Sequence, residues 1–320
     1  MKMLLTMISA CMCLGAVSRE GDTDFSNGSE TPSKDGTTCV KVGSYNVRLS
    51  SGDRNTPNAW IERREDLIAH IKELDLDVFG MQEVRPDAAE YFRKQLDDWV
   101  FVGEHRGSDR KSDEASPVFY RKSRFEAKKV GTFWLSETPD KPGSRGWKAM
   151  CPRVCSYAIL KDKRTGKTFC FANTHTDHAS ALAREKGMLL VLQRMKSFGE
   201  GAPIVFVGDH NCYEHEVPAK AVSKILRDTL YVTETPPKGS WRTFNGWTWA
   251  DAELTATDAL KKPVGSRDNT KANIKRIDYI YVSPDVRVFN YKSHCDSRPG
   301  KNLYYSDHFP VTATVLFPSK

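Results

Sequence analysis

The stretch VCSYAILKDKRTGKTFCFANTHTDH, residues 154–178, contains two apolar runs of strand length, Val154–Leu160 and Thr168–Asn173. Only a short polar segment joins them, too short to hold a helix. Parallel neighbours need a long crossover connection, so two strands in direct succession argue against a purely parallel sheet. His175 and Asp177 follow the second run at once. The stretch therefore predicts a mixed sheet with polar side chains at a strand end.

On both sides of this stretch, short apolar runs alternate with segments of helical periodicity. Further strands are expected at 40–47, 77–81, 117–120, 203–207, 274–282 and 310–317, and helices at 59–74, 86–98, 179–197 and 217–228. Strands outnumber helices, which favours an α/β fold of two mixed sheets packed face to face with helices outside. Segments 136–151 and 236–267 are expected to be ordered loops, and the second holds Trp241, Trp247 and Trp249.

The chain has 320 residues, of which 39% are hydrophobic, so a sizeable core is expected. No composition shift marks a boundary after the first forty residues, which predicts one domain over 39–320 and a monomer. No apolar run reaches the roughly 18 residues that a membrane-spanning helix needs. A transmembrane segment is therefore not expected.

The N-terminus has the pattern of a secretory signal. Lys2 precedes an apolar stretch, 3–17, and the small residues Ala16 and Ser18 follow where signal peptidase requires them. Residues 1–18 are predicted to be the signal and 19–38 a polar, flexible linker. The chain is thus expected to be exported, either to a periplasm or by secretion. A lipoprotein attached at Cys11 is the open alternative.

Cysteine content and net charge leave several alternatives open. Six cysteines follow the signal, at positions 39, 151, 155, 170, 212 and 295, and their pairing cannot be derived from the sequence. Cys170, inside an apolar run, fits a small buried hydrophobe. The net charge of +7 fits either a solvated surface or attraction to an anionic partner: nucleic acid, a phospholipid headgroup or a phosphorylated small molecule.

The polar residues that suggest chemistry share one placement, at or beside the end of an apolar strand, where layered folds present groups to a common crevice. They are Asn46, Glu83, His175, Asp177, Asp209, Asn211, Asp278, Asp307 and His308. Glu83 and Asp307 offer the carboxylate oxygens that a hard divalent cation prefers. Asp209 could activate water, and a histidine could act on a phosphoryl oxygen. Taken singly, each residue could also be a turn or cap residue.

The order of these residues carries a resemblance. The motifs 44–47 (SYNV), 82–84 (QEV), 173–178 (NTHTDH), 208–211 (GDHN), 276–280 (RIDYI) and 306–311 (SDHFPV) closely resemble the successive motifs of the endonuclease/exonuclease/phosphatase superfamily. The resemblance covers about residues 40–317. It implies a four-layer α-β-β-α sandwich of the DNase I-like kind. It also implies cleavage of a P–O bond by water with Mg²⁺, or with Mn²⁺ in its place.

The resemblance also implies a role for each matched position. Glu83 is expected to be the main metal ligand, with Asn46 and Asp307 beside it. The expected catalytic residues are Asp209, which activates water, Asn211, His308 with its partner Asp278, and His175 with its partner Glu114. Tyr120, Arg153, Asn46 and Asp177 are expected to contact the substrate.

Two positions depart from the family pattern. Arg48 stands where abasic-site endonucleases have an acidic metal ligand, which argues against an abasic-repair role. His210 replaces the usual aromatic or apolar residue of its motif and is expected to point into packing.

Three functions follow as hypotheses. The first is a phosphodiesterase, either a nuclease or a phospholipase C-like enzyme. The second is a phosphomonoesterase that acts on a phosphorylated sugar or inositol. The third is a catalytically inactive binding module, against which the retention of Glu83, Asp209 and His308 argues.

Overall fold

The computed structural model describes residues 38–248, 254–268 and 275–318. The predicted signal and almost all of the predicted linker lie outside these residues, as does Trp249. Within the described parts, no helix has both the length and the apolar character that crossing a membrane requires.

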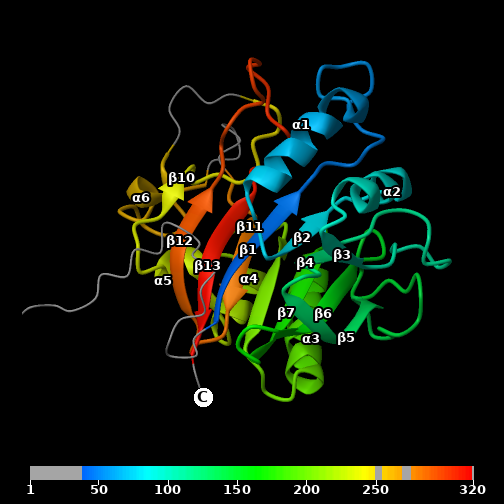
Figure 1. Cartoon of the computed structure of the whole chain (residues 1–320), viewed down its shortest axis with the longest axis vertical. Coiled ribbons are helices and arrows are strands. Elements are labelled where there is room, and N and C mark those ends of the chain that lie inside the picture. Colours follow the sequence, from blue (N-terminus) through cyan, green and yellow to red (C-terminus); the bar gives the residue numbers. More distant parts are fainter. Residues whose placement is uncertain (1–37, 249–253, 269–274, 319–320) are drawn as a thin grey trace, which may run out of the picture. The chain divides into compact units, whose positions relative to one another are not determined.

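Two mixed sheets form the centre of the fold (Figure 1). The first has the order β10-β12-β13-β1-β2-β4-β3, and the second has the order β5-β6-β7-β8-β11-β9. The strands of the first are β1 (Thr38–Asn46), β2 (Val78–Gln82), β3 (Trp99–Val102), β4 (Val118–Arg121), β10 (Lys238–Gly239), β12 (Arg287–Ser293) and β13 (Val311–Phe317). Those of the second are β5 (Phe125–Trp134), β6 (Val154–Asp162), β7 (Thr168–His175), β8 (Ile204–Asp209), β9 (Arg227–Asp228) and β11 (Asp278–Val282).

Four helices cover the outer faces of the two sheets: α1 (Trp60–Glu73), α2 (Pro86–Gln95), α3 (Ala181–Phe198) and α4 (Val217–Ser223). The short α5 (Thr229–Val232) and α6 (Ala256–Ala259) pack against the cluster between the sheets. Pro86 occupies the first turn of α2, where its missing N–H costs nothing. The Ser180 hydroxyl caps α3 by accepting the Ala183 N–H. Helices α2 and α3 therefore begin where the sequence signals a start.

Three hydrophobic clusters show the layering. One joins the facing sides of the two sheets, for example Val42 of β1 with Val205 of β8. The second packs α1 and α2 on the first sheet, and the third packs α3 and α4 on the second sheet. The order of layers is α-β-β-α, which confirms the predicted fold class.

Parallel pairs place strand ends together at one edge of the sandwich. β1 runs parallel to β2, with Asn46 opposite Gln82. β7 runs parallel to β8, with His175 opposite Asp209. β11 lies antiparallel to β8, with Asp278 opposite Asp209. The carboxyl ends of the four central strands thus meet at one edge, as the sequence predicted.

Asn173 in β7 ties the two sheets together just below this edge. Its Nδ2 donates to the backbone oxygens of Met81 (2.7 Å) and Pro117 (2.8 Å) in the first sheet. Its Oδ1 accepts from the Gln82 Nε2 at 2.7 Å. A Cβ added to Gly80 would lie 2.7 Å from the Asn173 Cβ. The glycine therefore makes the close approach possible.

Candidate active site

Three residues just after strand ends have a positive φ, a backbone conformation that few non-glycine residues adopt. Glu83, directly after β2, has φ of 63°, and Asn211, just after β8, has φ of 46°. Arg48, after β1, has φ of 55°. Left-handed backbone at non-glycine residues is costly and gathers at functional sites. The three positions lie around the same cavity.

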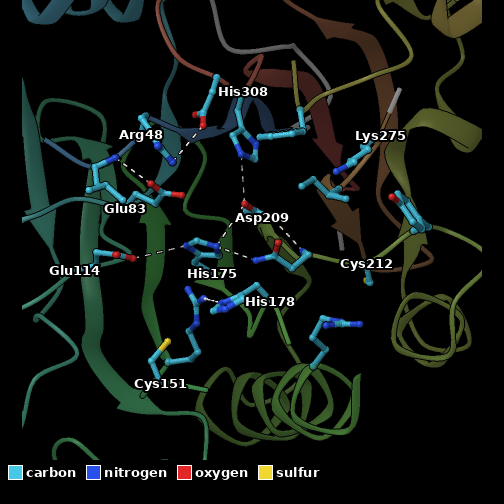
Figure 2. A pocket seen from close by; sticks show the side chains of 18 of the residues that line it. Arg48, Glu83, Glu114, Cys151, His175, His178, Asp209, Cys212, Lys275 and His308 are labelled. Atoms are coloured by element: carbon cyan, nitrogen blue, oxygen red, sulfur yellow. Dashed lines mark hydrogen bonds and ion pairs between the residues drawn. The ribbon is translucent and has the colours of Figure 1, made fainter. Parts of the chain in front are cut away.

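A cavity of about 490 Å³ opens at the shared edge of the sheets. Of the residues expected in the site, it is lined by Glu83, Glu114, Arg153, His175, Asp209, Asn211, Asp307 and His308. Figure 2 shows Glu83 and His308 above Asp209, and His175 and Glu114 below it. The structure therefore brings together residues that are up to 225 positions apart in the sequence (308 − 83 = 225).

The carboxylates of Glu83 and Asp307 face this cavity and fit a hard divalent cation. The Glu83 Oε2 accepts the Leu49 N–H at 2.9 Å, and its Oε1 accepts the Asn46 Nδ2 at 3.0 Å. Burial raises the pKa of Asp307; the charge of His308 opposes this shift, and that of Glu83 adds to it. A cation between the two carboxylates would remove their repulsion. The donor set thus agrees with the metal site that the sequence predicted.

Asn46 supports this cluster from beneath. It is fully buried, and its Nδ2 also donates to the Asp209 Oδ2 at 3.0 Å. Its Oδ1 accepts the Arg48 N–H at 3.0 Å. Because Asn46 does not line the cavity, it orients two carboxylates rather than touching the substrate. The prediction that Asn46 contacts the substrate is therefore not supported by the structure.

Asp209 has the environment of a general base. Burial raises the pKa of its carboxyl to about 7, with repulsion from Asp278 adding to the shift. His308 and the hydrogen bonds from the Asn211 N–H and Asn46 act in the opposite direction. A base is most effective when its pKa lies near the working pH. Asp209 could therefore take a proton from water near neutrality.

His308 is held as a cation by its carboxylate partner. Its Nδ1 donates to the Asp278 Oδ2 at 2.9 Å, and its Nε2 lies 3.7 Å from the Asp209 Oδ2. Burial lowers the pKa of His308, but attraction to Asp278, their hydrogen bond and the charges of Asp209 and Asp307 outweigh it and raise the value to about 10. The imidazolium is placed to stabilise negative charge on a phosphoryl oxygen.

His175 is instead held neutral. Burial lowers its pKa well below the usual value, and the charges of Arg153 and Arg106 add to this. Its Nε2 lies 2.9 Å from the Asn211 Nδ2, which donates to it. The Nδ1 lies 4.0 Å from Glu114, whose carboxylate also pairs with Arg106 at 3.1 Å. The expected pairing of Glu114 with His175 is thus a longer-range contact, shared with an arginine.

Two expected substrate contacts lie elsewhere. Tyr120 is buried between the sheets, because the register of β4 puts it opposite Val78, at the far end of β2 from Glu83. Asp177 is also buried, and its oxygens accept the N–H groups of Met150, Ala179 and Ser180. Neither residue lines the cavity. Asp177 stabilises the loop after β7 and does not contact a substrate in the cavity.

Arg48 and His210, the two residues that depart from the family motifs, lie in different surroundings. Arg48 faces the cavity, with its Nη1 3.5 Å from the Asp307 Oδ2 and its Nε 2.9 Å from Asp53. His210 is fully buried, and its ring packs beside those of Tyr279 and Tyr281, at ring-centroid distances of 5.6 and 5.7 Å. The predicted packing role of His210 is confirmed.

Several lining residues were not predicted. They are Arg106, Cys151, Arg184, Cys212, Tyr213, Glu216, Phe244, Lys275 and Ile277. Apart from Ile277, which directly precedes β11, they come from helix turns and loops, so strand-end placement could not find them. His178 also lines the cavity; the sequence marked it only as part of the motif after His175.

The comparisons with known proteins agree with this geometry. The model of the endonuclease/exonuclease/phosphatase family matches residues 43–308. A protein of that family from Bacteroides thetaiotaomicron is 32% identical, with a TM-score of 0.76 over 88% of this chain and 96% of its own. A mannosyl-6-phosphatase from the same species is 32% identical, with a TM-score of 0.75 over 87% and 100%.

More distant structures share the fold alone. The catalytic domain of human nocturnin is 16% identical, with a TM-score of 0.64 over 87% of this chain and 94% of its own. A search among curated proteins found no match.

Proposed function

Because the chain belongs to the endonuclease/exonuclease/phosphatase family, we propose that it is a Mg²⁺-dependent phosphomonoesterase that acts on a phosphorylated sugar. Members of this family are metal-dependent phosphoester hydrolases, so the class of reaction follows from membership. The choice of ion and of a monoester is the proposal.

The choice of a phosphorylated sugar as the substrate rests on the size of the cavity. Its volume of about 490 Å³ lies in the range of small-molecule sites. A polymer would need an open groove, whereas a hexose phosphate fits a cavity of this size. The similarity to a mannosyl-6-phosphatase over that protein's whole length supports the same class of substrate.

Residues around the cavity can be assigned to the steps of the proposed hydrolysis. Asp209 takes a proton from water, whose oxygen forms a bond to phosphorus while the bond from phosphorus to the sugar oxygen breaks. Asn211 orients the water, and the His308 imidazolium stabilises the phosphoryl oxygens. The leaving oxygen takes up a proton from solvent. Glu83 and Asp307 would hold the cation, which supplies Lewis-acid polarisation of the phosphoryl group when bound.

A phosphodiester is the second candidate, and one observation favours it. Phe244, Lys275 and Ile277 continue the cavity past His308, with the Phe244 ring edge-on to the imidazole at a centroid distance of 5.0 Å. This surface could receive the second ester group of a lipid headgroup or nucleotide.

Hydrolysis of 4-nitrophenyl phosphate, its bis-ester and mannose 6-phosphate, each with Mg²⁺, Mn²⁺ or chelator, tests the proposal. We expect Mg²⁺-dependent turnover of both monoesters and much less of the diester, all lost in Asp209→Asn. Preference for the diester would replace the proposal with the second candidate. No turnover of any phosphoester by the folded protein would point to a binding module.

Export and a monomeric state belong to the same proposal. The basic and apolar N-terminal pattern of residues 1–18 supports export. Sequencing the N-terminus of the mature protein should show a start at or near residue 19. Retention of Met1 in the mature protein would contradict export.

A further inference from the structure

One wall of the cavity is rich in hydrogen-bond donors. Arg153 precedes β6, His178 lies between β7 and α3, and Arg184 is in the first turns of α3. All three line the cavity. The two arginines are only 6% and 7% exposed, respectively. Long side chains so deeply buried need partners for their N–H groups.

Much of this hydrogen-bonding capacity is unused among the described residues. The Nε and Nη1 of Arg153 and the Nε of Arg184 are buried without a hydrogen-bond partner there. The Nη2 of Arg153 lies 3.1 Å from the His178 Nδ1. Since Arg153 can only donate, that nitrogen accepts, and His178 carries its proton on Nε2. The wall therefore has at least four donor groups available to a ligand.

The charge of this wall is also poorly compensated. Arg48 and Arg106, in the same cavity, each pair with two carboxylates. The Asp177 Oδ2 lies 4.0 Å from the Arg153 Nε, and that carboxylate already accepts three backbone N–H groups. The charge of Glu114 also acts on Arg153, but the Glu114 carboxylate pairs with Arg106. The contact found for the Arg184 Nη1 is a backbone oxygen, that of Asp177 at 3.0 Å. Buried cations without counter-charge are strongly unfavourable, which calls for an anion.

His175 separates this wall from the reacting centre. Its ring lines a small side pocket together with Arg153, and its Nε2 lies 3.4 Å from the Asp209 Oδ2. Figure 2 shows the ring between Asp209 and His178. An anion at the wall would thus lie beside the group that is hydrolysed.

We propose that Arg153, His178 and Arg184 form an anion-binding subsite that takes a phosphate or carboxylate oxygen of the substrate. The proposal rests on the proposed function, because it names how that substrate is held. Two sources have the required chemistry: an oxygen of the phosphoryl group that is cleaved, or a second anionic group on the sugar. A bidentate guanidinium suits either one.

Binding of inorganic phosphate to the full chain in chelator, measured by calorimetry, tests the subsite without any turnover. Removing the cation leaves phosphate binding to the cationic side chains of the cavity, those of the wall among them. We expect Arg153→Gln and Arg184→Gln each to weaken phosphate binding roughly 10- to 100-fold. Arg194→Gln, which removes an arginine from the same helix outside the cavity, should bind like the parent protein.

Kinetics with a matched pair of substrates shows which anionic group of the substrate occupies the subsite. If Arg184→Gln raises KM for glucose 1,6-bisphosphate but not for glucose 6-phosphate, the subsite holds the second group. If both KM values rise alike, it holds the phosphoryl group that is cleaved. Arg153→Lys and Arg184→Lys keep the charge and should recover part of the loss, which separates binding from misfolding.

Unchanged phosphate affinity in both glutamine variants, with melting temperatures like that of Arg194→Gln, would overturn the subsite. Failure of the proposed function looks different: the parent protein would bind phosphate in chelator yet hydrolyse neither sugar phosphate.

Discussion

At the scale of single residues, the pair Asp209 and His308 sets the pH dependence. Asp209 must be ionised to accept a proton, and its pKa is raised to about 7. His308 must be protonated to stabilise charge, and its pKa is raised to about 10. Activity should therefore rise with pH up to about 7, stay level, and fall above about 10, a profile of kcat/KM with two limbs.

Asp278→Asn should move both limbs to lower pH. Removing its charge ends the repulsion that raises the pKa of Asp209 and the attraction that raises the pKa of His308. The plateau should also fall, because the imidazole loses its charged partner. Profiles of kcat/KM for the parent and the variant check this expectation. An acid limb that stays in place would show that another group titrates.

The sequence was sufficient for those residues that lie at or beside strand ends. Glu83, Asp209 and His308 meet in the cavity as predicted, since strand direction decides which ends share an edge. Tyr120 was misplaced because its position depends on the register of β4 with β2, which the sequence does not specify. Arg184 was missed because a basic residue in a helix is ordinary until the fold turns that face toward a cavity.

At the scale of elements, most apolar strands were predicted, but the short apolar β3 (Trp99–Val102) was missed, as were the amphipathic or irregular strands. Strand β5 has seven exposed or half-exposed residues in its middle, Glu126 to Thr132, so it lacks an apolar run. Strand β12 contains a register shift near Asn290, whose φ is 54°. Edge position and a bulge hide the strand pattern. The helix expected at 217–228 ends at Ser223 instead.

The contact of Gly80 with Asn173 should couple β2 to β7 energetically. A Cβ at Gly80 would meet three atoms, all of the Asn173 side chain. Gly80→Ala should therefore cost about 1 to 3 kcal/mol of unfolding free energy through overpacking. Asn173→Ala should cost about 2 to 5 kcal/mol, because it leaves buried backbone oxygens without donors.

A double-mutant cycle gives the decisive measurement. In the Asn173→Ala background the contacts with Cγ and Oδ1 are absent and only the Cβ contact of 2.7 Å remains, so Gly80→Ala should cost less there than in the parent protein. Denaturant unfolding of the four proteins yields the coupling free energy. Additive effects of the two substitutions would mean that Gly80 is constrained by something other than the asparagine.

At the scale of the whole molecule, the predicted metal site links ligand binding to stability. Glu83 follows β2 and Asp307 precedes β13, so a shared cation would connect two strands that are not neighbours in the first sheet. A ligand that binds only the folded chain adds stability by mass action, about 2.7 kcal/mol at a hundredfold excess over Kd. For a domain of this size that corresponds to a rise in Tm of roughly 5 to 10 °C.

Thermal unfolding with saturating Mg²⁺ and with chelator measures this rise directly. Glu83→Gln should abolish most of it, because one of the two carboxylates that would hold the cation loses its charge. Glu126→Gln is the matched control, since it removes a carboxylate from the exposed part of β5 and should retain the full rise. If Mg²⁺ still raises the Tm of Glu83→Gln by as much as that of the control, the cation binds elsewhere. The assignment of Glu83 and Asp307 as its ligands would then be wrong even if turnover required the metal.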